Sequence, residues 1–390
     1  MSELKVNSIK GVAASTAAIT VNNTDGTCIA NITNNLSNRR LTINGAMTIS
    51  QRGTSSTSDA YLLDRFHTSA SSNDESPTYA QVDVASGTTP YSLGFRKALK
   101  ITNGNQTSGA QAGSYVAIYT PQEAQNIANS GWNYTSSSSN ITFSFWVKAS
   151  VSKTYYFYFK TPDGSAYLYP METGVLTADT WTKVTKTIPG NSNITINNDN
   201  GVGIEILIWP YIGTNYTNSG VTLNTWQSYS GTARVPDDAT SWFTTNDATF
   251  EITGVQLEVG DHATDFEFLS HADELRRCKR YYRILQDASG GACYMGAVAY
   301  NYDVNSVVVQ VNFEEEMRTT PTLDNTSGSG YYRFYRNSGY VDINAFNAIN
   351  GMNKYGGGFN NSDSGNGTAG QTGAVILNNT AAKLAFDAEL

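Results

Sequence analysis

The chain has 390 residues, a formal net charge of −8 and charged side chains at 15% of its positions. This length is sufficient for two or three domains with large hydrophobic cores. The acidic, hydroxyl-rich composition contains no basic stripe that would follow a phosphate backbone, so nucleic-acid binding is not expected. No apolar run approaches the roughly 20 residues that a membrane-spanning helix needs, so membrane insertion is not expected either.

The first segment, residues 1–55, contains short β-prone pieces such as LKVNSI and RLTING and almost no aromatic side chain. Such a segment has too little apolar surface for a core of its own. We expect an attachment arm that lies against a partner chain, a particle surface or a second copy; a disordered leader is the alternative. No continuous apolar stretch follows the first methionine, so we expect no signal peptide and synthesis in a cytoplasm.

The segment 56–270 starts with a Ser-rich stretch that is expected to form loops. Short runs of β-branched and aromatic residues then alternate with Gly, Pro, Asn and Asp turns, which is typical of strands. The pattern predicts an all-β fold with an antiparallel jelly-roll β-sandwich. The predicted strands are 79–84, 96–102, 114–119, 141–149, 154–161, 181–188, 203–212 and 249–258.

Two short helices are predicted beside these strands. The first is 121–129, with Thr120 as N-cap, Pro121 at the first helical position and Glu123 in the first turn. The second lies in a linking segment, 271–283. Its packed face is expected to carry Leu275, Cys278 and Tyr282, and the mostly solvated side chains are Arg276, Arg277 and Arg280.

The last segment, 284–390, returns to strand-like runs such as SVVVQVNFEE and YYRFYR. It is expected to form a smaller C-terminal β-sandwich domain. The glycine-rich stretch 351–370 is predicted to be an exposed loop, because its composition does not support a packed core.

Signatures of common enzymes are absent from the sequence: it has no G-x-S-x-G, H-E-x-x-H or P-loop motif. The three histidines (His67, His262 and His271) are not spaced as metal ligands. The three cysteines (Cys28, Cys278 and Cys293) form no C-x-x-C pair and are interpreted as small apolar residues. We therefore expect no enzyme activity, no cofactor and no metal.

Two groups of acidic residues give alternatives to the expectation of no enzyme activity and no metal, and the sequence favours both less. A glycosidase needs two carboxylates across a groove, and Glu205 lies in the apolar run GIEILIWPY. Alternation along the strand predicts that Glu205 faces outward, opposite Ile204 and Ile206. A second cluster is read as a solvated turn, with a calcium site as the alternative; it comprises Glu258, Asp261, Asp265 and Glu267.

The aromatic residues carry more information about function. In ITFSFWVKAS, alternation places Phe143, Phe145 and Val147 in the core. In TYYFYFK, the predicted core residues are Tyr155, Phe157 and Phe159, and the opposite face carries Tyr156, Tyr158 and Lys160. Trp146, Trp181 and Trp242 are also assigned to the core.

Sugar rings stack on aromatic faces while their hydroxyls need polar partners, so exposed aromatics among Asn, Asp, Gln and Lys indicate a glycan site. A contact between subunits or ordinary packing would also cover such a face. The candidate glycan-binding residues are Tyr156, Tyr158, Lys160, Tyr167, Tyr169, Trp209, Tyr211, Tyr216 and Trp226, with Tyr229 nearby.

Several motifs resemble those of a known family. ITFSFWVKAS, TWTKVTKTIPG and FEITGVQLEVGDHATDFEF, in this order, are similar to strands of the carbohydrate-binding-module-like jelly roll in virion proteins of marine tailed phages, especially cyanophage tail fibres. LSHADELRRCKRYY resembles the short helix that closes this module, and SELKVNSIKG with RRLTINGAMTISQRG resembles the N-terminal attachment segment. The resemblance covers residues 1–55 and 79–283.

The resemblance implies a virion appendage protein, most simply a homotrimeric tail fibre. Its arm would bind other tail or capsid proteins, and its outer part would recognise a host cell-surface glycan or protein. A capsid decoration or spike protein without a specific receptor is the first alternative, and a glycan-degrading appendage enzyme is the second. No ligand residue is matched to the family one for one, so the candidate site rests on strand faces alone.

Overall fold

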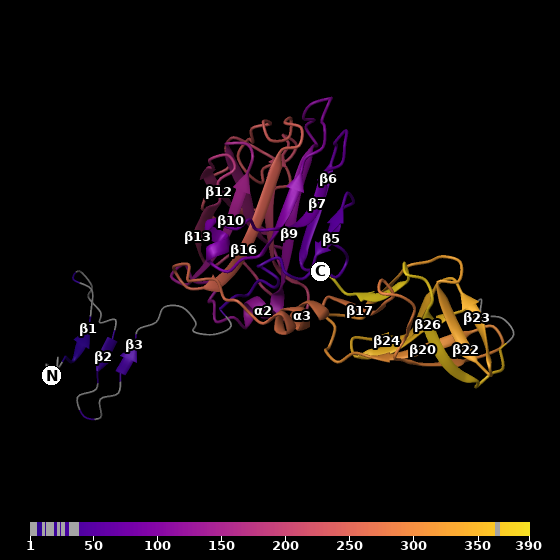
Figure 1. The fold of residues 1–390 in the computed structure, drawn as a ribbon. Helices are drawn as coiled ribbons and strands as arrows, with labels where there is room; N and C mark the ends of the chain where they lie inside the picture. Colours follow the sequence, from indigo (N-terminus) through magenta and orange to yellow (C-terminus); the bar gives the residue numbers. More distant parts are fainter. Residues whose placement is uncertain are drawn as a thin grey trace.

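A computed structural model describes residues 6–9, 12, 19–21, 24, 28–30, 39–362 and 367–390. The described pieces at the N-terminal end include a three-stranded antiparallel sheet of β1 (Ser8–Ile9), β2 (Ile19–Val21) and β3 (Cys28–Ala30). The rest of the structure is almost entirely β, arranged as two sandwiches (Figure 1). The predicted all-β class is confirmed.

The larger sandwich is a jelly roll of two antiparallel sheets. The first sheet has six strands in the order β13-β10-β16-β8-β7-β4. Its members are β4 (Ser55–Ser56), β7 (Thr78–Asp83), β8 (Lys97–Thr102), β10 (Asn140–Ala149), β13 (Thr182–Pro189) and β16 (Thr249–Val259).

The second sheet has seven strands in the order β15-β12-β11-β14-β9-β6-β5. Its members are β5 (Ala60–Leu63), β6 (Phe66–Ser71), β9 (Tyr115–Glu123), β11 (Thr154–Thr161), β12 (Tyr167–Val175), β14 (Val202–Ile212) and β15 (Gln227–Ser228). All eight predicted strands are present, with bounds within one residue at most ends; the far end of β9 differs most.

The main core lies between these two sheets, and alternation along the strands determines which side chains enter it. Phe143 and Phe145 of β10 meet Phe157 and Phe159 of β11, with Phe145 and Phe157 ring centroids 5.3 Å apart. All four rings are fully buried. Trp242 is buried in the same core, as predicted. The core assignment of Trp146 and Trp181 is wrong, because both are half-buried and pack against a separate small cluster.

Two local predictions for this domain are wrong, and one short helix was missed. The Ser-rich stretch after residue 56 contains the hairpin β5–β6, because Leu62, Leu63 and Phe66 supply enough apolar surface to pair and bury it. A short helix, α1 (Thr89–Ser92), was not predicted. The predicted helix 121–129 is shorter, α2 (Ala124–Ala128), because residues 121–123 continue β9 by pairing with β14.

Residues 39–55, the last part of the predicted arm, pack on the jelly roll. Leu41 N donates to Leu257 O at 2.8 Å, and Val255 N donates to Gly45 O at 2.9 Å. A Cβ on Gly45 would lie 2.0 Å from Val255 O, so only glycine permits this approach. The Arg40 guanidinium is buried and pairs with Glu274 of the linking helix. The sandwich therefore begins near residue 39.

The linking helix α3 (His271–Lys279) begins at Ser270, whose hydroxyl accepts from Asp273 N at 3.2 Å. Cys278 is buried and Leu275 packs beside it, as predicted, but Tyr282 starts the next strand. The arginines differ from one another: Arg276 is exposed, while Arg277 and Arg280 are half-buried. Arg280 pairs with Glu123 at 2.6 Å, so the prediction that it is solvated is wrong.

The C-terminal domain has one sheet of order β17-β27-β21 and another of order β23-β22-β26-β19-β20-β25-β24, with β18 pairing to β26. The strands are β17 (Tyr282–Asp287), β18 (Cys293–Tyr294), β19 (Val298–Asn301), β20 (Val307–Asn312), β21 (Thr322–Asn325), β22 (Tyr332–Arg336), β23 (Gly339–Ile343), β24 (Ala348–Asn353), β25 (Gly356–Asn361), β26 (Thr372–Leu377) and β27 (Lys383–Asp387). A second core lies between them.

The glycine-rich stretch 351–370 is only partly a loop. Its first half contains the end of β24 and all of β25, and Phe359 is fully buried. Gly356 and Gly357 have φ of +138° and +151°, and a Cβ on Gly357 would lie 2.5 Å from Met352 Cα. Glycine is therefore required here so that the two strands can approach. Residues 363–366 lie outside the described chain.

The cysteines differ in their surroundings. Cys278 is buried, as predicted, and Cys293 is half-buried; both are free thiols. The side chain of Cys28 lies outside the described part of the structure. None of the helices in the described segments has the length and hydrophobicity of a membrane-spanning helix.

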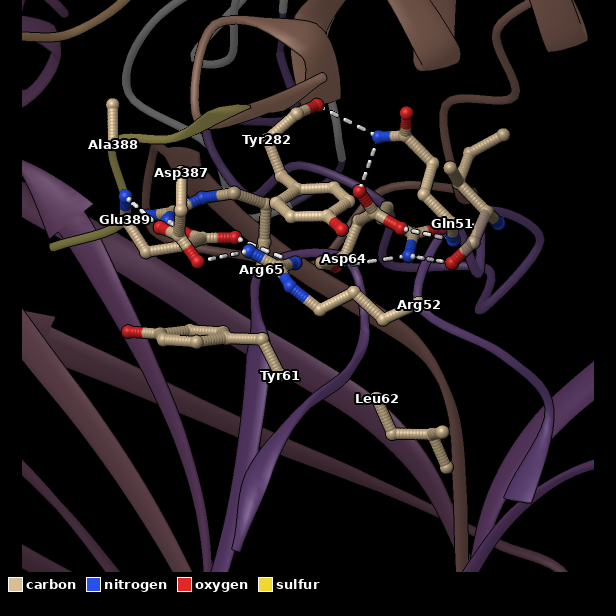
Figure 2. A network of polar contacts seen from close by, with 12 residues as sticks. Gln51, Arg52, Tyr61, Leu62, Asp64, Arg65, Tyr282, Asp387, Ala388 and Glu389 are labelled. Atoms are coloured by element: carbon tan, nitrogen blue, oxygen red, sulfur yellow. Dashed lines mark hydrogen bonds and ion pairs between the residues drawn. The ribbon is translucent and has the colours of Figure 1, made fainter. Parts of the chain in front are cut away.

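A polar network joins the two sandwiches, and we call it the joint (Figure 2). Arg65 pairs with Glu389 while its second nitrogen donates to Pro121 O at 2.6 Å. The side chains of this ion pair are 3% and 6% exposed, so both charges are removed from water. Arg52 reaches the same Glu389 at 3.4 Å and Asp387 at 3.0 Å. The charges of the two domains are thus matched inside the contact.

Further contacts complete the joint. Gln51 Nε2 donates to Asp64 Oδ1 at 2.6 Å and to Tyr282 O at 2.8 Å. The Arg52 guanidinium lies 3.5 Å from the centroid of the Tyr282 ring. Arg318 of the C-terminal domain donates to Glu389 O at 2.6 Å. It also donates to Asn200 O of the jelly roll at 2.9 Å. The joint therefore couples residues far apart in the sequence.

We predict that Glu389→Gln loosens the joint, because Arg65 keeps its buried charge without a counter-charge. Removal of one partner from such a pair costs about 3–5 kcal/mol. Hydrogen exchange should become faster in β17 and β27, and small-angle scattering should show a broader range of domain arrangements.

The matched control is Asp387→Asn, which changes a carboxylate that is 35% exposed. Its effect should stay below about 1 kcal/mol. Equal effects of the two variants, or no change in exchange for Glu389→Gln, would contradict the importance of the buried pair.

Candidate functional site

The seven-stranded sheet has apolar side chains on both faces. Its inner face forms the main core, and its outer face carries a second buried cluster built around Tyr158 and Trp209. Each is 2% exposed, and their ring centroids are 5.9 Å apart. The segment 213–238, here called the covering loop, contributes Val235 to this cluster with Tyr216 and Tyr229 packed beside it. The loop therefore removes much of the outer face from water.

Backbone hydrogen bonds hold the covering loop on the sheet. Asn224 N donates to Pro170 O at 2.8 Å, and Tyr229 N donates to Ala166 O at 2.9 Å. Within the loop, Arg234 N donates to Tyr216 O at 2.8 Å. The loop is therefore an ordered part of the outer face.

A buried ion pair anchors the end of the covering loop. Lys153 Nζ lies 2.6 Å from Asp238 Oδ1, and the two side chains are 5% and 1% exposed. Lys153 also donates to Ala239 O at 2.9 Å and lies 4.8 Å from the centroid of the Tyr155 ring. Burial raises the pKa of Asp238 to about 6, although Lys153 acts in the opposite direction.

The nine candidate glycan residues separate into two groups. Four lie on the inner side, in or against the main core: Tyr167, Tyr169, Tyr211 and Trp226. Tyr211 enters that core because a β-bulge between Ile208 and Tyr211 shifts the register of β14 against β9. These four side chains do not face the outer surface of the sheet.

The other five candidates do lie on the outer side: Tyr156, Tyr158, Lys160, Trp209 and Tyr216. Tyr158 is buried, and Tyr156 and Lys160 are half-buried. Lys160 pairs with Glu205 at 3.0 Å and lies 4.7 Å from the centroid of the Tyr229 ring. Trp209 and Tyr216 line a hollow on this face.

The hollow has a volume of about 310 Å³ and lies where β6, β9 and β14 meet the covering loop. One rung of its floor is formed by His67, Tyr119 and Leu207, which are paired across the three strands. Small side chains at Ser69 and Ala117, paired on the next rung, leave the depression open. The full lining is His67, Ser69, Tyr115, Ala117, Tyr119, Leu207, Trp209, Tyr216 and Arg234.

The rings around the hollow are set at steep angles to one another. Tyr115 packs edge-on against Trp209 at 5.7 Å and against Tyr216 at 5.8 Å between centroids. The Arg234 guanidinium lies 4.6 Å from the Tyr216 centroid. These contacts hold the aromatic walls in place before any ligand arrives, which lowers the entropic cost of binding.

The indole N–H of Trp209 is buried and has no hydrogen-bond partner within the described part of the chain. An unsatisfied buried donor costs roughly 1–3 kcal/mol, so an acceptor brought by a ligand would recover this energy. Burial lowers the pKa of His67, so its imidazole is neutral at pH 7 and offers one donor and one acceptor. The hollow thus combines aromatic walls with groups suited to hydroxyls.

The acidic residues considered for a glycosidase or a calcium site bind other groups of the protein. Glu205 faces outward, as alternation predicted, and its carboxylate is held by Lys160; it does not line the hollow. Glu258 is buried and accepts from Thr264 N at 2.8 Å, and Glu267 accepts from Arg40 N at 2.8 Å. Glu258 thus binds a donor in the loop after β16 and Glu267 binds one in the segment 39–55, so the solvated-turn interpretation is wrong for these two carboxylates. No group of three or more His, Cys, Asp or Glu suited to a metal ion occurs among the described residues.

Sequence reasoning missed more than half of the lining, including His67, Tyr115, Tyr119 and Arg234. Tyr115 and Tyr119 alternate with the apolar Val116 and Ile118, which was a usable signal for an outward aromatic face. The position of His67 depended on the unpredicted hairpin β5–β6, and that of Arg234 depends on the path of the covering loop. Neither has a local sequence signal.

Comparison with known proteins gives no matching family model and no similar curated protein sequence. Similar solved structures include carbohydrate-binding-module-like jelly rolls and a phage tailspike domain. The enzymatically active domain of tailspike protein 4 of bacteriophage CBA120 matches over 56% of this chain, with 8% identity and a TM-score of 0.31. The match spans only 21% of the tailspike chain.

Two of the jelly rolls are carbohydrate-binding domains. The xylan-binding domain from Paenibacillus barcinonensis matches 57% of this chain and 96% of its own, with 10% identity and a TM-score of 0.26. The N-terminal cellulose-binding domain of Cellulomonas fimi β-1,4-glucanase C matches 54% and 97%, with 11% identity and a TM-score of 0.27.

We predict that Lys153→Met lowers the free energy of unfolding by about 3–5 kcal/mol at pH 7, because Asp238 keeps a buried charge without its partner. Without Lys153, the pKa of Asp238 should not fall below its present value of about 6. The carboxyl is then protonated as the pH falls through this region. The deficit relative to wild type should therefore shrink between pH 7 and pH 5.

Urea unfolding followed by tryptophan fluorescence measures this effect, because all six tryptophans lie between residues 132 and 242. The double variant Lys153→Met/Asp238→Leu serves as the control and should recover part of the lost stability. A deficit that is constant between pH 7 and pH 5 would show that the charge of Asp238 is not its cause.

Proposed function

We propose that this chain is a virion appendage protein, most simply a tail fibre, whose jelly roll binds a glycan on the host surface. The observation that carries the glycan part is the hollow on the outer face, which is lined by Trp209, a residue whose buried indole N–H has no hydrogen-bond partner among the described residues. Aromatic walls accept the C–H faces of sugar rings, the indole N–H of Trp209 donates to a hydroxyl oxygen, and neutral His67 offers one donor and one acceptor.

The size of the hollow favours one or two sugar units rather than a long chain. A volume of about 310 Å³ is at the lower end of the range for small-molecule sites. The affinity of one such site is expected to be weak, and several copies on one particle would act together. A homotrimeric appendage would supply these copies.

The virion part of the proposal rests on the motifs of the leader and of the linking helix. In this proposal the N-terminal segment binds other tail or capsid proteins, and the protein is located in the virion. The buried joint supports a mechanical role, because it holds two domains in one arrangement. The chain acts here as a binding protein and not as an enzyme.

We predict that Trp209→Phe weakens binding of short neutral oligosaccharides about tenfold, because the indole donor is lost while an aromatic wall remains. Titration calorimetry on the full chain measures the dissociation constant. Tyr156→Ala is the matched control, since Tyr156 lies on the same face but does not line the hollow. Equal affinities of wild type and Trp209→Phe would refute the hollow as the glycan site.

We also predict that deletion of residues 1–30 prevents incorporation into particles and leaves oligosaccharide affinity unchanged. The deleted segment ends before residue 39, where the described sandwich begins. Purified particles from a complementation experiment would be analysed by mass spectrometry for this chain. Normal incorporation of the shortened chain would overturn the role of the arm and leave the glycan site untouched.

A further inference from the structure

A larger groove lies on the C-terminal domain, across strands β19, β20 and β25, and has a volume of about 850 Å³. It shares no residue with the hollow of the jelly roll. Its lining consists of Val298, Tyr300, Tyr302, Asp303, Ser306, Val308, Gln310, Val311, Asn312, Gly351, Gly357, Gly358 and Asn360.

The sheet register explains the shape of the groove. Along β20, Val307, Val309 and Val311 point into the core, so Val308 and Gln310 point outward. Val308 pairs with Tyr300 on one side and Asn360 on the other. On the next outward rung Gln310 lies between Val298 and Gly358. The glycine carries no side chain, so the floor is open beside Gln310.

The rim of the groove carries exposed apolar side chains. Val298 is 64% exposed and Tyr302 is 69% exposed. Tyr300 lies between these two residues, on strand β19, and is half-buried. Contiguous exposed apolar side chains are uncommon on a protein surface without a binding partner.

The wall also contains an unsatisfied acceptor. The Oδ1 atom of Asn360 is buried and has no hydrogen-bond partner among the residues that the structure describes. A buried amide oxygen in this state favours a donor from outside the chain. Gln310 and Asn312, both exposed on the neighbouring strand, supply further amide donors and acceptors along the same groove.

The charges of the residues that line the groove limit the charge of the ligand that it can bind. Among the residues that the structure describes, no Lys or Arg lines the groove, so the described lining offers no cation to a phosphate, sulfate or carboxylate. Asp303, the acidic side chain in the described lining, is engaged by its own turn, because it accepts from the N–H groups of Asn305 and Ser306 at 2.8 Å each. A neutral polyhydroxyl ligand fits this combination of amides, tyrosines and absent cations.

We propose that the groove of the C-terminal domain is a second saccharide site, which takes a neutral oligosaccharide of several units. Tyr300 and Tyr302 stack on sugar faces, and Asn360 accepts a hydrogen bond from a sugar hydroxyl. The site uses none of the residues of the jelly-roll hollow, so it stands or fails independently of the function proposed above.

The test uses the full chain and a panel of neutral gluco-, manno-, galacto- and xylo-configured hexaoses with one sulfated hexasaccharide. At least one neutral hexaose should bind, and the sulfated probe should bind no tighter than its neutral parent. Hydrogen exchange with mass spectrometry should show protection of β20 and β25, strands that are distinct from β9 and β14 of the hollow.

Two variants test the assigned roles. Asn360→Leu should weaken hexaose binding about tenfold without lowering the melting temperature, because it removes an unsatisfied buried oxygen at similar side-chain volume. Tyr302→Ala should also weaken binding about tenfold. The matched control is Tyr355→Ala, since Tyr355 is 57% exposed on the same domain and does not line the groove.

Three results would overturn the inference. The first is that no neutral hexaose binds the wild-type chain at millimolar concentration. The second is that Tyr302→Ala and Asn360→Leu bind as wild type does, while protection appears only in β9 and β14. The third is that Tyr302→Ala changes the oligomeric state in light scattering, which would assign the groove to a contact between copies of this chain.

Discussion

A sheet with apolar side chains on both faces must be covered on both sides, and this requirement organises the jelly roll. The inner face of the seven-stranded sheet meets the six-stranded sheet, while Tyr158 and Trp209 on the outer face need a separate cover. The covering loop supplies it, held at one end by Lys153 and Asp238. Where the cover stops, at Tyr115 and the strands beyond it, the hollow remains. The candidate site is thus the uncovered remainder of a buried face.

The contact between the two sandwiches follows a different principle, because charges rather than apolar rings lie at its centre. Glu389 receives Arg65 and Arg52 within one buried contact, and Tyr281 and Tyr282 lie under the two guanidinium groups. Matched charges of this kind contribute little net stability compared with apolar packing, but they penalise every arrangement that leaves one charge alone. The joint therefore selects one orientation of the domains.

The side chains whose position depends on local periodicity could be predicted from the sequence. Alternation in TYYFYFK correctly placed Tyr155, Phe157 and Phe159 in the core, because period-two geometry needs no knowledge of the rest of the chain. It failed at Tyr211, where a bulge changes the parity of the strand. The pair of Arg65 and Glu389, 324 positions apart, carries no local signal at all. The same holds for the hollow, whose walls come from three strands and a loop.

A joint with little freedom also fixes the separation between the hollow of the jelly roll and the groove of the C-terminal domain. Two sites on a flexible tether search a wide range of distances, whereas two sites on one rigid body match only certain distances well. With both sites occupied, such a chain would distinguish surfaces by the spacing of their sugars as well as by the identity of the sugars. The buried pair of Arg65 and Glu389 would then keep the two sites at a constant separation.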